Sequence, residues 1–187
     1  GTYERNTVAI KAALLAVRKA KPEAVVMISS YKPAATFIKL AREIKFDPTF
    51  VNVSFVGSDA LAKELGSNGA GVVVTQVVPF PLDNKIPGVA RYQAALKSVA
   101  PDAKPGFVSL EGYLVSRTLI AGLEKMDGAP TRKGLIEAVQ KASPIDVGGM
   151  KLSYSTTSNR GSDQVFLTVI QADGSLKAVD RLQKAGM

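Results

Sequence analysis

The sequence predicts an α/β fold with a parallel sheet in its first half, further helices after it, and a β-hairpin near its end. Three observations support this prediction. Apolar runs of strand length alternate with helical stripes through the first 78 residues, which is the pattern of a parallel sheet with helical crossovers. Asp173-Gly174, a strong hairpin signal, separates the last two apolar runs. The 187 residues are 46% hydrophobic and 21% charged, as expected of a globular chain.

The first half of the chain supplies three helix–strand pairs in succession. Its opening helix carries Ile10, Leu14 and Val17 on one face and ends before Pro22. Helices are then predicted from the apolar stripes within 37–44 and 60–65, and Gly66 is the expected carboxyl cap of the second. Continuous apolar runs, typical of parallel strands buried on both faces, predict strands at residues 24–28, 51–56 and 72–78.

The pattern changes after residue 78. Pro79, Pro81 and Pro87 predict a loop that crosses between structural units. The remaining elements are predicted as helices around 89–96, over 111–126 and, behind the cap Thr131, over 131–139, with strands at 150–154, 165–171 and 176–179. The expected organisation is therefore 1–78, 79–146 and 147–187. Because the helices of the middle segment have no strands of their own to cover, their partner strands are expected outside this sequence.

Composition limits the chemistry. The chain has no Cys and no His, which excludes disulfides, thiol nucleophiles, Ser-His-Asp triads and His-ligated metal sites. The net charge of +8 is scattered, without a run of five basic residues, and indicates a solvated basic surface rather than a nucleic-acid site. No apolar run reaches the length of a transmembrane helix, and the polar opening residues do not resemble a signal peptide. These features favour binding over catalysis, with no cofactor and no metal.

Candidate site residues follow the predicted parallel strands. Ser30 and Tyr31 come after the first strand, Ser58 and Asp59 after the second, and Gln76 lies in the third. Ligands of open parallel sheets bind beyond the carboxyl ends of the strands, so we expect these side chains to converge at one edge. The helices that begin there add backbone donors and a positive dipole.

Each of these residues also has a structural interpretation. Ser58 or Asp59 can serve only as a helix N-cap, and Tyr31 can be a packing residue with its hydroxyl in water. Gln76, inside an apolar run, needs hydrogen-bond partners either in the core or in a site. The convergence of these residues is therefore more informative than any one of them.

Several ordered segments resemble a known family. They are Tyr3-Glu4-Arg5-Asn6-Thr7, Val26-Met27-Ile28-Ser29-Ser30-Tyr31-Lys32, Ser54-Phe55-Val56-Gly57-Ser58-Asp59-Ala60-Leu61, Val74-Thr75-Gln76-Val77-Val78-Pro79 and Ser109-Leu110-Glu111-Gly112-Tyr113. The chain resembles the carboxy-terminal half of periplasmic solute-binding proteins of the branched-chain amino-acid type, the receptors of ABC importers. The resemblance implies two α/β lobes with the ligand between them. Residues 1–78 would form most of the second lobe, 79–146 the crossover and helices of the first lobe, and 147–187 a β-rich segment near the hinge. The family's amino-terminal half would be absent.

The resemblance also implies roles for individual residues. Tyr31 matches an aromatic residue that packs on the ligand's amino group, and Asp59 matches an acidic residue that pairs with it. A register shifted by one would put Ser58 in that place, and Gln76 matches a position near the cleft. The implied protein is a non-enzymatic receptor for an amino acid or similar solute. It would be periplasmic, or extracellular and membrane-anchored, with a membrane permease as partner.

Two other functions stay open on the sequence alone. Similar domains serve as ligand-sensing input modules of signalling receptors. A carboxylate in a cleft could also be catalytic, which would make the chain an enzyme.

Overall fold

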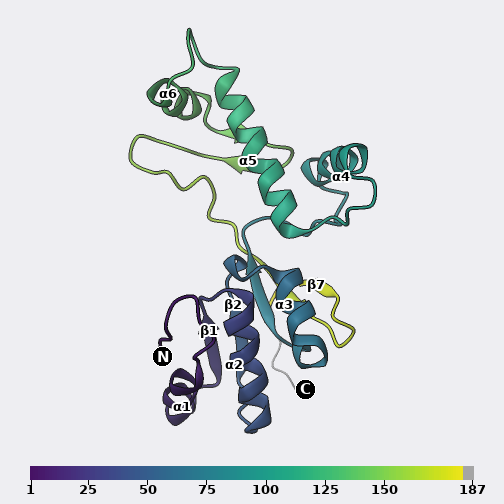
Figure 1. The fold of residues 1–187 in the computed structure, drawn as a ribbon. Helices are drawn as coiled ribbons and strands as arrows, with labels where there is room; N and C mark the ends of the chain where they lie inside the picture. The colour runs from purple at the N-terminus through teal and green to yellow at the C-terminus, as the bar shows by residue number, and fades with distance from the viewer. Residues whose placement is uncertain (183–187) are drawn as a thin grey trace. The chain divides into compact units, whose positions relative to one another are not determined.

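The computed structural model describes residues 1–182, which form two compact units (Figure 1). The first unit comprises Gly1–Val77 together with the chain from Val165 onward, and the second comprises Val78–Gln164. The chain thus leaves the first unit after Val77 and returns to it at Val165. How these units correspond to the lobes of a larger protein stays a prediction.

The first unit is built on a five-stranded sheet of order β1-β2-β3-β6-β7. Its strands are β1 (Ala24–Met27), β2 (Thr49–Asn52), β3 (Val73–Gln76), β6 (Phe166–Ile170) and β7 (Leu176–Val179). The first three are parallel, and the predicted hairpin β6–β7 joins the sheet because β6 pairs antiparallel with β3. The α/β fold class and the carboxy-terminal hairpin predicted from the sequence are therefore confirmed.

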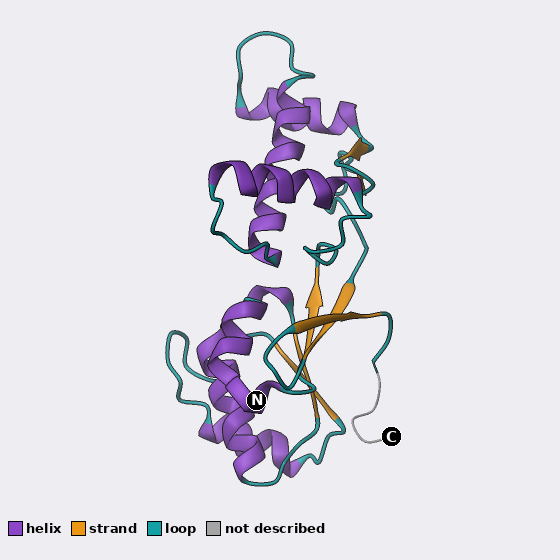
Figure 2. Cartoon of the chain, turned by 90° about the vertical axis from the view of Figure 1, so that its right-hand side faces the viewer, coloured by secondary structure: helices purple, strands orange, loops and turns teal. Residues whose placement is uncertain are grey.

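Helices cover one face of this sheet. They are α1 (Lys11–Lys19), α2 (Tyr31–Glu43) and α3 (Ser58–Leu65), and Figure 2 shows the helices of this unit gathered on one side of the strands. The core lies between the two layers: Phe50 of β2 meets Phe37 of α2 edge-on, with ring centroids 6.4 Å apart. Each such large apolar side chain contributes about 1.5–3 kcal/mol on burial. On the uncovered face, Val26 of the edge strand β1 remains 69% exposed.

One predicted strand is wrong in its second half. The apolar run 51–56 was expected to be a single strand, but β2 ends at Asn52 and Ser54–Val56 forms a short 3-10 turn, η1. The backbone N–H of Val56 donates to the carbonyl of Val53 at 3.0 Å, which closes the turn. Gly57 follows with φ +75°, a conformation that ends an extended strand and that glycine adopts without strain. The apolar run is thus divided between a strand and a turn.

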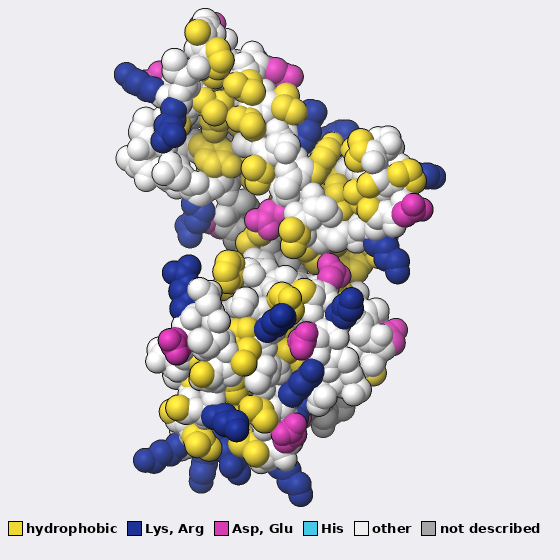
Figure 3. Space-filling view, viewed as in Figure 1, with side chains coloured by type: hydrophobic (Ala, Val, Ile, Leu, Met, Phe, Trp, Pro, Cys, Tyr) yellow, Lys and Arg dark blue, Asp and Glu magenta, His cyan; other side chains and the backbone are white. Residues whose placement is uncertain are grey.

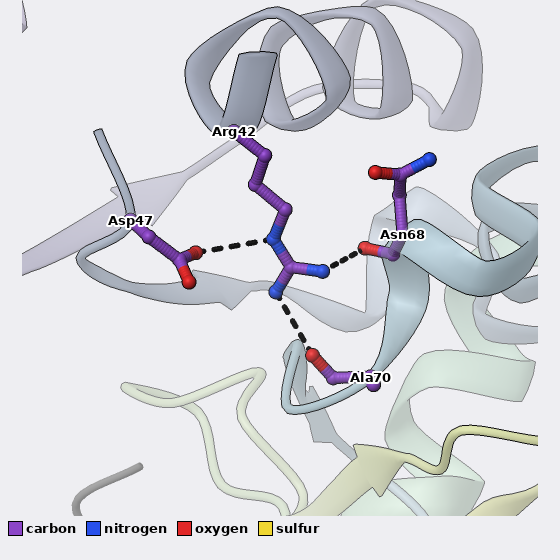
Figure 4. A network of polar contacts seen from close by, with 4 residues as sticks. All are labelled: Arg42, Asp47, Asn68 and Ala70. Atoms are coloured by element: carbon purple, nitrogen blue, oxygen red, sulfur yellow. Dashed lines mark hydrogen bonds and ion pairs between the residues drawn. The ribbon is translucent and has the colours of Figure 1, made fainter. Parts of the chain in front are cut away.

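Arg42, in the last turn of α2, anchors the Gly-rich segment that precedes β3 (Figure 4). Its guanidinium donates to the carbonyl of Asn68 and, at 2.8 Å, to that of Ala70, and it pairs with Asp47 at 3.1 Å. The exposed pair with Asp47 contributes at most about 1 kcal/mol. The two carbonyl contacts hold the loop because hydrogen bonds from a charged guanidinium are stronger than those between neutral groups. This glycine-rich segment therefore has a structural explanation.

The second unit contains α4 (Pro87–Val99), α5 (Phe107–Leu123) and α6 (Arg132–Ala142), followed by the short hairpin β4–β5 (Ile145–Asp146 and Lys151–Leu152). Thr131 is the N-cap of α6, as predicted: its hydroxyl accepts from the N–H of Gly134 at 3.0 Å. The predicted helix 111–126 instead spans Phe107–Leu123. It begins earlier because Phe107 is buried against Phe80, a contact that periodicity cannot show.

Loop contacts tie the β4–β5 hairpin to α4. The N–H of Gly88 donates to the carbonyl of Gly148 at 2.7 Å, and a Cβ at Gly88 would lie only 2.7 Å from the carbonyl oxygen of Val147. The Asp146 carboxylate accepts from the backbone N–H groups of Gly149 and Gly148, which lowers the pKa of Asp146 below 3.8. Glycine is needed at position 88 because the two backbones touch.

One face of α5 is apolar and exposed. Val108, Val115 and Leu119 recur at i, i+7 and i+11 and are 69%, 62% and 45% exposed. Figure 3 shows apolar side chains gathered over the part of the second unit formed by α5 and α6. Contiguous apolar surface of this kind is unusual on a monomeric soluble protein and promotes association.

We therefore expect the isolated 187-residue chain to self-associate. Sedimentation velocity should show multimers for the wild-type chain and a shift toward monomer for Val115→Lys, because a charge on the apolar face cannot be desolvated cheaply. Ser116→Lys adds the same charge to the exposed neighbouring position and is the matched control. A monodisperse wild-type monomer would contradict this expectation.

Candidate functional site

The candidate site is the carboxyl edge of the parallel strands. In the sheet register Met27 lies opposite Asn52, and β2 and β3 run in the same direction, so β1, β2 and β3 all end at this edge. The segments that follow the strands are 28–30, 53–57 and 77. Two helices, α2 and α3, begin directly after the first two segments.

Ser30 and Tyr31 lie at the start of α2. Ser30 is the N-cap residue in extended conformation, but its hydroxyl makes no capping hydrogen bond and the residue is exposed. Tyr31 is partly buried and packs against the core. The neighbouring Ser29 is buried, and its hydroxyl contacts the Tyr3 hydroxyl at 3.0 Å. The Ser30 hydroxyl is thus presented at the edge beside Tyr31, whereas Ser29 belongs to the interior.

Ser58 and Gln76 lie together in the interior of the first unit. The Gln76 Nε2 donates to Ser58 Oγ at 2.6 Å and to Thr168 Oγ1 at 3.0 Å, and Thr168 donates to the carbonyl of Val74 at 3.0 Å. Ser58, Gln76 and Thr168 are 3%, 2% and 1% exposed. This buried network joins the first turn of α3 to β3 and β6. Gln76 therefore makes its side-chain hydrogen bonds in the core.

Thr168 was missed by sequence reasoning. It lies 92 residues from Gln76, so the pairing becomes visible only once β6 is placed beside β3. A signal was present, because Thr168 is a polar residue in the middle of the apolar run Phe166–Ile170. The same signal had identified Gln76 as a residue that needs hydrogen-bond partners.

Asp59 occupies the first turn of α3, where a carboxylate interacts favourably with the helix dipole. It is exposed overall but lines a groove of about 440 Å³ that α3 shares with the β6–β7 turn, including Lys63 and Asp173. Partial burial of the carboxyl raises the pKa of Asp59 above 3.8, and a hydrogen bond from its own backbone N–H opposes this effect. Tyr31 does not line this groove. The β6–β7 turn lies at the amino edge of the parallel strands, because β6 runs antiparallel to β3. The structure therefore places Tyr31 and Asp59 on the first turns of two neighbouring helices without bringing them into one pocket.

Other residues at the edge were not identified as site residues from the sequence. Ile28, Phe55 and Val77 are 77%, 75% and 47% exposed, although all three lie in runs that were interpreted as buried strands. Asn52 is fully buried, and its side-chain amide has no hydrogen-bond partner among residues 1–182. The edge therefore combines hydroxyl groups with exposed apolar side chains, and several polar side chains are buried beneath it.

Two further observations concern the described part of the chain. Residues 1–182 contain no group of three or more Cys, Asp or Glu side chains arranged to hold a metal ion. Within the same residues, no helix combines the length and the apolar character that crossing a bilayer requires.

Comparison with known proteins identifies the family. A family model described as periplasmic binding protein matches residues 1–175. A possible leucine/isoleucine/valine-binding protein from Rhodopirellula baltica SH 1 is 35% identical, with a TM-score of 0.89 over 96% of this chain. The chain belongs to the periplasmic binding protein family. This confirms the resemblance stated above and agrees with the prediction that the chain is not an enzyme.

More distant solved structures share the fold. A substrate-binding periplasmic protein from Ralstonia solanacearum is 23% identical, with a TM-score of 0.82 over 95% of this chain and 51% of its own. A fatty acid ABC transporter substrate-binding protein from Thermomonospora curvata is 17% identical, with a TM-score of 0.77 over 98% and 49%. The match to the Rhodopirellula protein likewise covers 49% of that chain. The chain thus spans about half the length of these solved structures. No curated protein sequence matches it.

Proposed function

We propose that this chain is part of the solute-binding component of an ABC importer and that it binds a small amino acid or a related organic solute without chemical turnover. The observation that carries this proposal is the 35% identity, over 96% of the chain, to a possible leucine/isoleucine/valine-binding protein. The geometry supports it, because three parallel strands end at one edge with hydroxyl groups and two helix N-termini.

In this proposal the solute lies between the two lobes of the complete protein, and the carboxyl edge of the first unit forms one wall. Tyr31 offers an aromatic face to an ammonium group, an attraction of about 0.5–2 kcal/mol. Asp59 supplies the negative charge and Ser30 an exposed hydroxyl group. Ser58 and Gln76 are buried and hydrogen-bonded to each other, and in this proposal they hold the first turn of α3 in position.

The proposal also specifies location and partner. The complete protein acts in the periplasm, or outside the cell on a membrane anchor, and delivers its solute to a membrane permease. Within it, residues 1–78 form most of the second lobe. Residues 79–146 supply the crossover and helices of the first lobe, and residues 147–187 supply a β-rich segment near the hinge.

The test is direct binding to the full-length protein. Native mass spectrometry of freshly purified protein should reveal a co-purified small molecule, and calorimetric titration with the twenty amino acids should then identify one that binds with micromolar or tighter affinity. The titrated solute must be recovered unchanged after incubation. Conversion of the solute, or the absence of binding by any amino acid or co-purified compound, would refute the proposal.

A further inference from the structure

The exposed aromatic ring of Phe55 is the most unusual feature of the carboxyl edge. Of the seven phenylalanines in the chain, only Phe55 is exposed, at 75%. Aromatic side chains normally bury most of their surface, because they carry a large hydrophobic contribution. The ring therefore needs an explanation beyond packing.

The local backbone holds this ring outward. Within the turn η1, the N–H of Val56 donates to the carbonyl of Val53 at 3.0 Å and that of Gly57 to the carbonyl of Ser54 at 3.1 Å. Val56 is 2% exposed and anchors the turn in the core, so its neighbour Phe55 is directed away from the core. Gly57, with φ +75°, then lets α3 begin at once. The position of Phe55 is thus set by a short, hydrogen-bonded turn rather than by a long loop.

The segments that follow the strands carry no charged side chain, and the carboxylate of Asp59 comes after them in the first turn of α3. Ile28 and Val77, which follow β1 and β3, are exposed as well, and neither they nor the segments 28–30 and 53–57 contain a charged residue. The polar groups interspersed among them are the hydroxyls of Ser30 and Ser54. Small-molecule sites typically have this composition, with apolar and aromatic walls and a few polar groups. An apolar, flat part of a solute fits these segments, whereas a charged group placed against them and away from Asp59 would be desolvated without a partner.

We infer that Phe55 is a specificity-determining residue that stacks on an aromatic ring of the solute. The inference rests on the proposed function and narrows its solute class to compounds that carry a planar aromatic group. Stacked and edge-to-face aromatic pairs gain free energy beyond the area they bury, which an aliphatic group of similar size does not gain.

Two matched pairs of probes test this inference on the full-length protein. L-phenylalanine is compared with L-leucine, and benzoate with cyclohexanecarboxylate, by calorimetric titration of the wild type, Phe55→Ala and Phe55→Tyr. We expect the wild type to prefer the aromatic member of a pair, and Phe55→Ala to lose about tenfold in affinity for that member only. Phe55→Tyr should keep the preference. Val99→Ala, which removes an exposed apolar side chain of the second unit, should change neither affinity.

The outcomes separate this inference from the proposed function. Binding of L-leucine at least as tight as that of L-phenylalanine, or equal losses for both members of a pair in Phe55→Ala, would overturn the role of Phe55 and leave solute binding intact. Binding of benzoate alone, with loss in Phe55→Ala, would support the role of Phe55 and refute an amino-acid ligand. Failure of all four probes to bind would overturn the inference. Thermal unfolding of each variant identifies losses of affinity that come from misfolding.

Discussion

Replacing Asp59 with alanine in the full-length protein is expected to weaken the binding of an α-amino acid by about 2–5 kcal/mol, because the ligand's ammonium group would be buried without its charge partner. Tyr31→Ala should cost less, about 0.5–2 kcal/mol, since it removes only a cation–π contact. Calorimetric titration measures both losses. Asp59→Asn keeps the volume of the side chain and is the matched control for charge. An unchanged affinity in Asp59→Ala would show that Asp59 does not pair with the ligand.

The same proposal predicts a dependence on pH. The pKa of Asp59 is raised above 3.8 by burial, and a bound ammonium group would lower it again by stabilising the carboxylate. Affinity should therefore have its full value at pH values above the pKa of Asp59 in the free protein, and it should fall as the pH drops through that pKa. Titrations between pH 7 and pH 4 should show this loss in the wild type but not in Asp59→Asn. If affinity changed with pH in the same way in the wild type and in Asp59→Asn, Asp59 would not be the charge partner of the ligand's ammonium group.

Gln76→Leu is expected to lower the free energy of unfolding of the first unit by about 2–4 kcal/mol. The variant removes the amide that donates to Ser58 and Thr168, and it leaves buried hydroxyl oxygens without that donor. Loss of the contact should also release the first turn of α3, which begins at Ser58. Native-state hydrogen exchange of the β3 amides measures the local free energy without assuming that both units unfold together.

A double-mutant cycle controls for the change in size. Thr168→Val alone removes one partner, and combined with Gln76→Leu it should show a coupling of about 0.5–3 kcal/mol, as expected for residues in contact. If the two effects simply add, the Gln76–Thr168 hydrogen bond does not contribute measurably to stability. A Gln76→Leu protein as stable as the wild type would show that the whole network is dispensable.

Element types and their order followed from local patterns. The strands β1 and β3, the helix cap at Thr131 and the β6–β7 hairpin were predicted because periodicity, capping and turn chemistry act over a few residues. The run 51–56 was misassigned because a strand and a 3-10 turn can carry the same apolar residues. Where the strand ends and the turn begins depends on which side chain faces the core, that of Val56 or that of Phe55. Both residues are apolar and adjacent, so the sequence does not show which of them is buried.

The sequence by itself determined the α/β class, the parallel strands, the hairpin and the family, since each depends on local patterns or on ordered segments of the chain. Only the tertiary structure decided that β6 pairs with β3, that Ser58 and Gln76 are buried in one network, and that Phe55 is exposed. The physical reason is the range of the contacts involved. Gln76 and Thr168 meet across 92 residues, and the burial of a side chain depends on which distant segments pack over it.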